Sequence, residues 1–87
     1  MNEELLELFM KNEVRIIFRK KTNGLIRELL GTLNKTYIPP EQYGVLSKIV
    51  TSLNESIIVV WDIESNDWRS FYMDSVINMF ESENISE

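Results

Sequence analysis

Hydrophobic and polar residues alternate along two stretches of the chain, and a polar turn interrupts each of them. In residues 14–30, Val14, Ile16 and Phe18 share one face of an extended strand, while Arg15 and Arg19 share the other. In residues 57–72, a β-branched run is followed by a polar turn and then by aromatic residues. A period of two is typical of half-buried strands, so the pattern predicts two β-hairpins.

The first hairpin turn contains Asn23 and Gly24. Both residue types tolerate positive φ angles and therefore suit a two-residue loop. Such a loop sets the cross-strand pairs, which are Phe18 with Leu29, Ile17 with Leu30, and Arg19 with Glu28. The opposite charges of the last pair favour this register.

The second turn is predicted at residues 64–67, with the sequence Glu-Ser-Asn-Asp. It sets four pairs, which are Ile63 with Trp68, Asp62 with Arg69, Trp61 with Ser70, and Val60 with Phe71. We expect Val59, Trp61 and Phe71 to lie in the core. We expect Asp62 and Arg69 to form a structural salt bridge between the strands.

Helical signals precede the first hairpin. Asn2 is a favourable N-cap, Glu3 and Glu4 follow it, and Leu5 and Phe9 belong to an apolar stripe at helical spacing. These residues predict an N-terminal helix over residues 3–11.

The middle of the chain permits two interpretations. Pro39 and Pro40 exclude a central strand at their position. An apolar stripe then fits a second helix within residues 40–53, and its members are Leu46, Ile49, Val50 and Leu53. Gly44 and the β-branched residues weaken helix formation, so a loop with a short strand remains the alternative.

The C-terminal part of the chain predicts one more strand. Asp74 and Ser75 form a turn or a single helical turn, and residues 76–80 form the strand. Residues 81–87 are expected to be a flexible acidic tail. Because 87 residues supply one modest core, residues 1–87 are predicted to form a single domain, with its barrel in residues 13–80.

Composition excludes several kinds of chemistry. The chain contains no cysteine and no histidine, which removes disulfides, thiolate nucleophiles, the usual zinc sites and imidazole acid–base catalysis. No paired carboxylates, glycine-rich phosphate loop or nucleophile–base arrangement is evident. We therefore expect a protein that is not an enzyme and that binds no cofactor and no metal.

The charge is distributed unevenly along the sequence. Residues 11–37 carry seven basic and two acidic residues, a balance of +5, whereas residues 38–87 carry two basic and nine acidic residues, a balance of −7. The chain as a whole has a net charge of −5. An acidic protein is a poor nonspecific binder of polyanions, although a local basic patch can still attract one.

The order of several short motifs resembles a known family. These motifs are Gly31-Thr32-Leu33-Asn34, Tyr37-Ile38-Pro39, Val59-Val60-Trp61-Asp62, Trp68-Arg69-Ser70-Phe71 and Met73-Asp74-Ser75-Val76. Together they resemble small proteins of tailed bacteriophages that have an Sm-like, SH3-type β-barrel fold distantly similar to WYL domains. The resemblance covers residues 13–80 and implies a mainly β (α+β) barrel of about five antiparallel strands. It also implies a phage origin, and it assigns no activity.

Two surfaces are candidates for binding. Trp68, beside the second turn, is the better aromatic anchor for a protein partner, and Tyr72 and Arg69 are its neighbours on the same strand. The alternative is a phosphate-binding patch on the first hairpin, formed by Arg15, Arg19, Lys20, Lys21 and Arg27. A solvated charged strand edge that prevents aggregation would explain the same basic residues without a ligand.

These observations favour a binding function. We expect a phage accessory protein that acts as a protein-interaction module and engages an unidentified host or phage protein. Nucleic-acid binding through the first hairpin is the alternative. The acidic N-terminus and the short apolar runs predict a soluble protein with no membrane association, located in the cytoplasm of the infected bacterial host.

Overall fold

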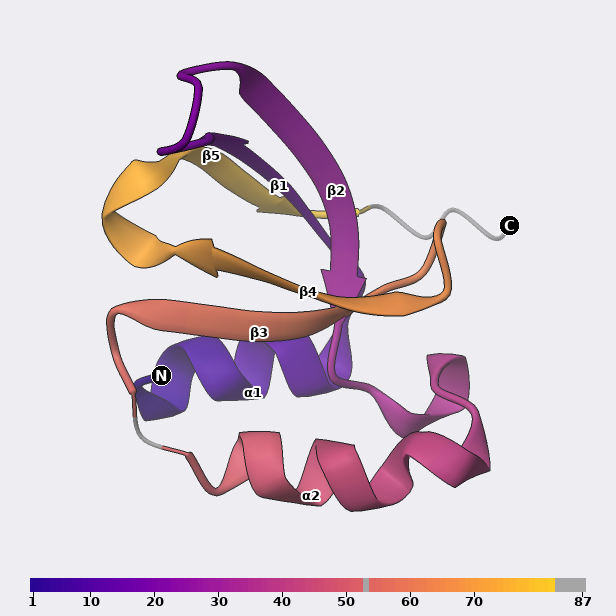
Figure 1. Ribbon diagram of the computed structural model, residues 1–87. Helices are drawn as coiled ribbons and strands as arrows, with labels where there is room; N and C mark the ends of the chain where they lie inside the picture. Colours follow the sequence, from indigo (N-terminus) through magenta and orange to yellow (C-terminus); the bar gives the residue numbers. More distant parts are fainter. Residues whose placement is uncertain (53, 83–87) are drawn as a thin grey trace.

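The computed structural model describes residues 1–52 and 54–82, and its five strands form one antiparallel sheet in the order β4-β3-β2-β1-β5. The elements in chain order are α1 (Glu3–Lys11), β1 (Val14–Arg19), β2 (Ile26–Thr32), η1 (Lys35–Tyr37), η2 (Pro40–Gln42), α2 (Tyr43–Val50), β3 (Ile57–Asp62), β4 (Asp67–Tyr72), η3 (Met73–Ser75) and β5 (Val76–Glu81). The sheet curls so that its two edge strands approach each other and the short 3-10 turn η3 connects them (Figure 1). The predicted five-stranded barrel is confirmed.

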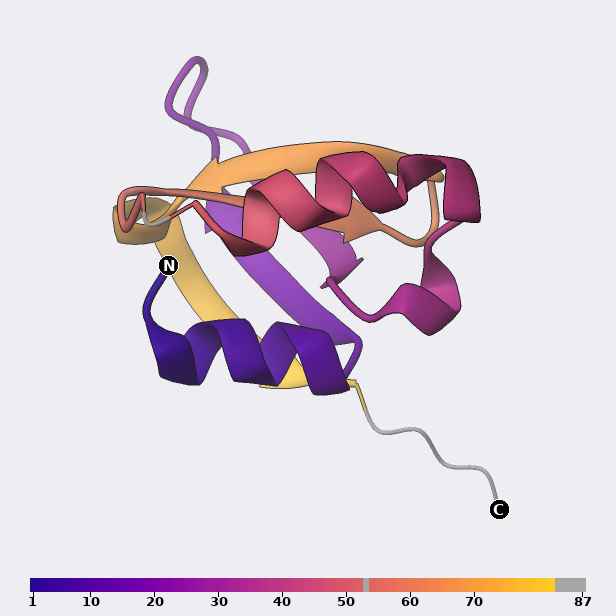
Figure 2. The same ribbon diagram turned by 90° about the horizontal axis from the view of Figure 1, so that it is seen from below.

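Helix α1 has the predicted bounds because its ends are capped as the sequence indicates. The Asn2 side chain accepts a hydrogen bond from the Leu5 N–H at 2.8 Å. At the other end, the Asn12 backbone N–H donates to the Leu8 carbonyl at 3.0 Å. Phe9 on this helix is fully buried. Both helices lie below β3, on the side away from the β1–β2 loop, as Figures 1 and 2 show.

Helix α2 settles the open interpretation of the middle segment in favour of a helix. Leu46 is buried, and Ile49 and Val50 pack at the edge of the core, as the apolar stripe predicts. Leu53, the last member of that stripe, lies outside the described residues.

The barrel interior contains the predicted face of β1. Its buried apolar residues include Val14, Ile16, Phe18, Leu29, Ile58, Val60 and Phe71. We call this side of the sheet the inner face. Trp61 is also only 3% exposed, but it lies on the outer face of β3, where Val59 is half-buried. The expectation that Val59 belongs to the core is thus only partly met.

The predicted register of the first hairpin is wrong by two residues. Phe18 lies opposite Arg27, and Leu29 lies opposite Ile16. The cause is a four-residue loop, residues 21–24, in which the Gly24 N–H donates to the Lys20 carbonyl at 2.8 Å. Within this loop only Gly24 has a positive φ, of 75°. The tight two-residue turn needs two residues with positive φ, so this loop is of another type.

The second hairpin is also displaced by two residues, because its four-residue loop begins one residue earlier than predicted. Arg69 lies opposite Val60, and Asp62 lies opposite Asp67, so the predicted Asp62–Arg69 pairing is wrong. The loop comprises residues 63–66, in which the Asn66 N–H donates to the Asp62 carbonyl at 2.8 Å. Asn66 has a φ of 55°, so both hairpin loops end on a residue in the left-handed region.

Strand β2 changes its partner near its C-terminal end. It pairs with β1 along most of its length, but with β3 only at Gly31 and Thr32. A Cβ atom added to Gly31 would lie 2.6 Å from Val60 Cγ2, so only glycine permits the two strands to cross this closely. The buried Thr32 hydroxyl lies 3.1 Å from the Phe9 carbonyl and 2.9 Å from the Asn12 carbonyl, and it thereby joins β2 to the end of α1.

The C-terminal strand begins after a 3-10 turn, as the sequence predicts, but it is one residue longer than expected. Glu81, which the sequence analysis assigns to the tail, lies opposite Val14 in the sheet. Residues 83–87 of the predicted tail lie outside the described residues.

We predict that Gly31→Ala destabilises the protein while Gly44→Ala does not. The new methyl group at position 31 would overlap Val60, and overpacking of this kind costs about 1 to 3 kcal/mol. Gly44, in α2, has no neighbouring atoms in the way, and alanine there should raise stability by up to about 1 kcal/mol. Thermal and urea denaturation measure both effects. Equal melting temperatures for Gly31→Ala and the parent would show that the strands do not depend on this contact.

Candidate functional site

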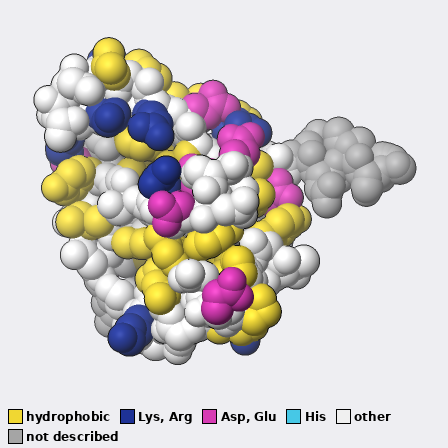
Figure 3. Space-filling view, turned by 45° about the vertical axis from the view of Figure 1, so that its right-hand side comes forward, with side chains coloured by type: hydrophobic (Ala, Val, Ile, Leu, Met, Phe, Trp, Pro, Cys, Tyr) yellow, Lys and Arg dark blue, Asp and Glu magenta, His cyan; other side chains and the backbone are white. Residues whose placement is uncertain are grey.

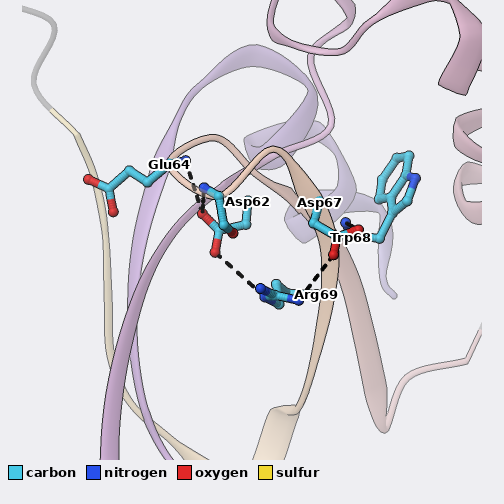
Figure 4. Close-up of polar contacts among 6 residues, drawn as sticks. Asp62, Glu64, Asp67, Trp68 and Arg69 are labelled. Carbon is cyan, nitrogen blue, oxygen red and sulfur yellow. Dashed lines mark hydrogen bonds and ion pairs between the residues drawn. The ribbon is translucent and has the colours of Figure 1, made fainter.

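The three residues predicted as a protein-binding surface all lie on β4. This strand pairs with β3 alone and is an edge of the described sheet. Trp68 and Tyr72 lie on the outer face of this strand, whereas Arg69 lies on the inner face with Phe71. Figure 4 shows the Trp68 indole directed away from the Arg69 guanidinium. The three residues therefore share a strand but do not form one patch.

Trp68 holds a neighbouring segment in place. Its ring meets that of Trp61 edge to face, with centroids 5.1 Å apart. Its indole Nε1 donates a hydrogen bond to Gln42 Oε1 at 2.9 Å. Because the side chain is half-buried and already engaged, it joins η2 to the sheet and leaves only part of its surface accessible to a partner.

Tyr72 lies at the other end of β4 and is 45% exposed. The Lys21 ammonium is 4.9 Å from the centre of its ring and 2.9 Å from Asp74 Oδ1. These contacts connect the β1–β2 loop to η3, which links the two edge strands. Tyr72 is therefore partly covered by a cation on the groove side.

Arg69 lies between two carboxylates (Figure 4). Its Nη1 is 3.3 Å from Asp67 Oδ2, and its Nε is 3.9 Å from Asp62 Oδ2. The expected contact between Asp62 and Arg69 therefore exists, but it is diagonal and long. Asp62 has another role, because its Oδ1 accepts hydrogen bonds from the backbone N–H groups of Glu64 and Ser65 in the second loop.

The outer edge of β4 has backbone groups available for pairing. The Met73 N–H donates to the Ser56 carbonyl, so the alternation of an antiparallel ladder directs the backbone groups of Trp68, Ser70 and Tyr72 away from β3. The Tyr72 carbonyl accepts from the Ser75 hydroxyl, and the Trp68 N–H donates to the Asp67 carboxylate. Ser70, which is exposed, thus presents an N–H and a carbonyl at the edge.

Two hollows border this edge and meet beside Ser70. Their volumes are about 210 and 360 Å³, and both are lined by Phe18, Lys20 and Ser70. Phe18 and Phe71 stack with their ring centres 5.6 Å apart and form the floor. We call the two hollows together the β4 groove. It separates β4 from the first hairpin.

The structure brings four of the five residues of the predicted basic patch to the β4 groove and places the fifth elsewhere. Lys20 and Arg27 line the larger hollow of the β4 groove together with Arg69. Arg15 lies on the outer face, where its Nη1 is 2.8 Å from Glu28 Oε2.

The remaining two predicted cations, Arg19 and Lys21, line the smaller hollow. Arg19 donates to the Gly24 carbonyl at 2.7 Å, and Lys21 pairs with Asp74 as described. Figure 3 shows that most basic side chains visible on this face lie in its upper part, with acidic side chains near them. Four of the five cations thus line the β4 groove, but Arg19 and Lys21 are already engaged there by neighbouring groups, and Arg15 lies apart.

One titratable group outside the β4 groove has an altered pKa. The pKa of Tyr37 is raised above its ordinary value, chiefly by a hydrogen bond to the Glu13 carboxylate and also by burial. Tyr37 lies outside the residues that line the β4 groove. In residues 1–52 and 54–82, no group of three or more acidic side chains is placed to hold a metal ion, and no helix is long and apolar enough to cross a bilayer.

Comparison with known proteins assigns the fold family. Residues 2–77 match the family model WYL_2, described as having an Sm-like SH3 beta-barrel fold, so the chain belongs to this family. It is also 29% identical over 76 residues to an "Uncharacterized 11.5 kDa protein in Gp31-cd intergenic region" of Enterobacteria phage T4. That alignment covers 87% of this chain and 74% of the phage protein. No solved structure shows significant similarity to the chain.

The predicted resemblance to a phage barrel family is confirmed, and the match also includes α1 and α2. Sequence reasoning identified β4 through its aromatic residues but did not identify Ser70 or the groove. Whether β4 is an edge strand depends on which strands pair with one another. The residues of β4 by themselves do not predict it.

We predict that Asp62→Ala destabilises the protein more than Asp62→Asn. Alanine removes the acceptor of two backbone N–H groups, at a cost of about 1 to 3 kcal/mol. Asparagine keeps an acceptor oxygen and removes only the long ion pair with Arg69, which should cost less than about 1 kcal/mol. Urea denaturation compares the two variants. Equal losses would show that the charge of Asp62, and not its bonds to the loop, stabilises the hairpin.

Proposed function

We propose that this protein is a non-catalytic protein-interaction module and that an extended segment of its partner adds to the free edge of β4. The observation that carries this proposal is the exposed backbone of Ser70 beside the β4 groove. An unpaired strand edge is a template for another strand, and peptide recognition by strand addition uses such an edge. The groove supplies space for the side chains of the added segment.

The backbone chemistry of the edge favours a peptide. Ser70 presents both a donor and an acceptor, and an added strand satisfies both. The backbone of a nucleic acid offers phosphate and sugar oxygens but no amide donor, so it would not reproduce the alternating pattern of a strand. Pairing within the protein also disfavours the phosphate-binding alternative, because Lys21 is bound to Asp74 and Arg15 to Glu28, which leaves fewer free cations for a phosphate chain.

The similarity to a phage protein supports a role during infection. We propose a phage accessory protein that engages a host or phage protein in the cytoplasm of the infected bacterium. Small modules of this kind act by binding, and the described residues present no arrangement of nucleophile, base and oxyanion donors that would indicate a reaction.

The proposal predicts that the partner lies close to Ser70. A photo-crosslinking amino acid at position 70 should form a discrete adduct with a protein in infected cells. The same amino acid in place of Ser47, an exposed residue of α2, is the matched control and should not form that adduct. Mass spectrometry identifies the adduct. Adducts to nucleic acid alone, or the same adducts from both positions, would contradict the proposal.

A substitution at the same position tests the backbone contact directly. Ser70→Pro removes the N–H that points away from β3, and an edge strand tolerates proline at such a position. Ser70→Ala keeps the N–H and removes only the hydroxyl. We expect Ser70→Pro to abolish retention of the crosslinked partner and Ser70→Ala to preserve it, with melting curves confirming that both variants fold. Retention by Ser70→Pro would rule out strand addition.

A further inference from the structure

We propose that the segment bound along β4 carries acidic residues at alternate positions and that Lys20, Arg27 and Arg69 bind their carboxylates. This inference rests on the proposed strand addition and specifies the chemistry of the partner. Side chains of an added strand alternate between the two faces of the sheet, about 6.8 Å apart on each face. Every second side chain would therefore enter the larger hollow of the β4 groove.

The larger hollow has an excess of positive charge. Its lining includes Lys20, Arg27 and Arg69 but only one acidic residue, Asp62. Arg69 is already in contact with Asp62 and Asp67. Within the part of the chain that the structure describes, Lys20 and Arg27 form no salt bridge, so their charges are available to a ligand.

Arg69 has a further unmet interaction. Its Nε is buried and has no hydrogen-bond partner in the described residues, although its guanidinium borders the hollow. The 3.9 Å separation from Asp62 Oδ2 is too long for a hydrogen bond. The Arg69 side chain is nevertheless 40% exposed, so a carboxylate that enters the hollow would contact the accessible part of the guanidinium and not the buried Nε.

The same hollow is poorly suited to a single-stranded nucleic acid. Binding of that kind combines phosphate contacts with stacking of bases on accessible aromatic rings. Phe18, the aromatic residue that lines this hollow, is only 9% exposed, and its ring stacks on that of Phe71. Lys21, the next cation along the groove, is paired with Asp74 and is therefore less available to a continuous phosphate chain. Isolated carboxylates on every second residue need neither base stacking nor a continuous row of cations.

The test uses selection from a phage-displayed library of random dodecapeptides on the full-length protein. We expect enriched peptides to carry Asp or Glu at positions two residues apart. A synthetic peptide of the consensus sequence should then bind in fluorescence anisotropy. Its affinity should fall roughly tenfold for the Lys20→Gln, Arg27→Gln double variant, since each exposed pair contributes modestly. Lys11→Gln, Lys48→Gln is the matched double control and should bind like the parent, because both lysines lie on helices outside the groove.

The outcomes separate this inference from the proposed function. Enrichment of basic or purely apolar peptides, bound equally by the parent and the Lys20→Gln, Arg27→Gln variant but not by Ser70→Pro, would overturn the acidic specificity and leave strand addition standing. Acidic peptides that bind Ser70→Pro as well as the parent would instead overturn strand addition. Equal binding of the consensus peptide and a dT12 oligonucleotide, lost in the charge variant, would show a general anion site and overturn the inference.

Discussion

The close approach of Val60 to Gly31 is the constraint on which the rest of the barrel depends. At this point β2 leaves its long ladder with β1 and pairs with β3 for two residues only. A side chain at position 31 would separate the strands, because Val60 Cγ2 occupies the space that its Cβ atom would need. The adjacent Thr32 hydroxyl then fixes α1 against the same strand, so one short segment joins both halves of the sheet to the first helix.

This crossing explains why β4 remains an edge strand. The β3–β4 hairpin is attached to the rest of the sheet only through the end of β2, so β4 faces the first hairpin across a groove and has no neighbouring strand on that side. The Lys21 contacts with Asp74 and Tyr72 connect the first hairpin to η3 at one end of the groove. An open backbone edge beside a hollow of fixed shape is the arrangement that strand addition requires.

Folding also redistributes the charges that the sequence separates into a basic and an acidic half. Lys21 comes to lie beside Asp74 from the acidic half, whereas Arg69 contacts Asp62 and Asp67 of its own half and Arg15 pairs with Glu28 across its own hairpin. Lys20 and Arg27 remain without such partners among the described residues, and both line the larger hollow. The side chains that line the larger hollow therefore carry a positive charge balance, opposite in sign to the net charge of −5.

The sequence by itself determined the helix at residues 3–11, the two hairpins and the faces of their strands, because capping and a period of two are local properties of the backbone. Both registers were displaced by two residues, and an even displacement preserves the faces, so Phe18 and Phe71 were still correctly placed inside. The registers depend on the loop hydrogen bonds that the Gly24 and Asn66 N–H groups donate. The alternation of hydrophobic and polar residues does not distinguish between loops that start or end at different residues. Only the tertiary structure decided that β4 has a free edge, that Ser70 lies on it, and that Lys20, Arg27 and Arg69 meet in one hollow, because each of these features requires strands distant in sequence to be placed together.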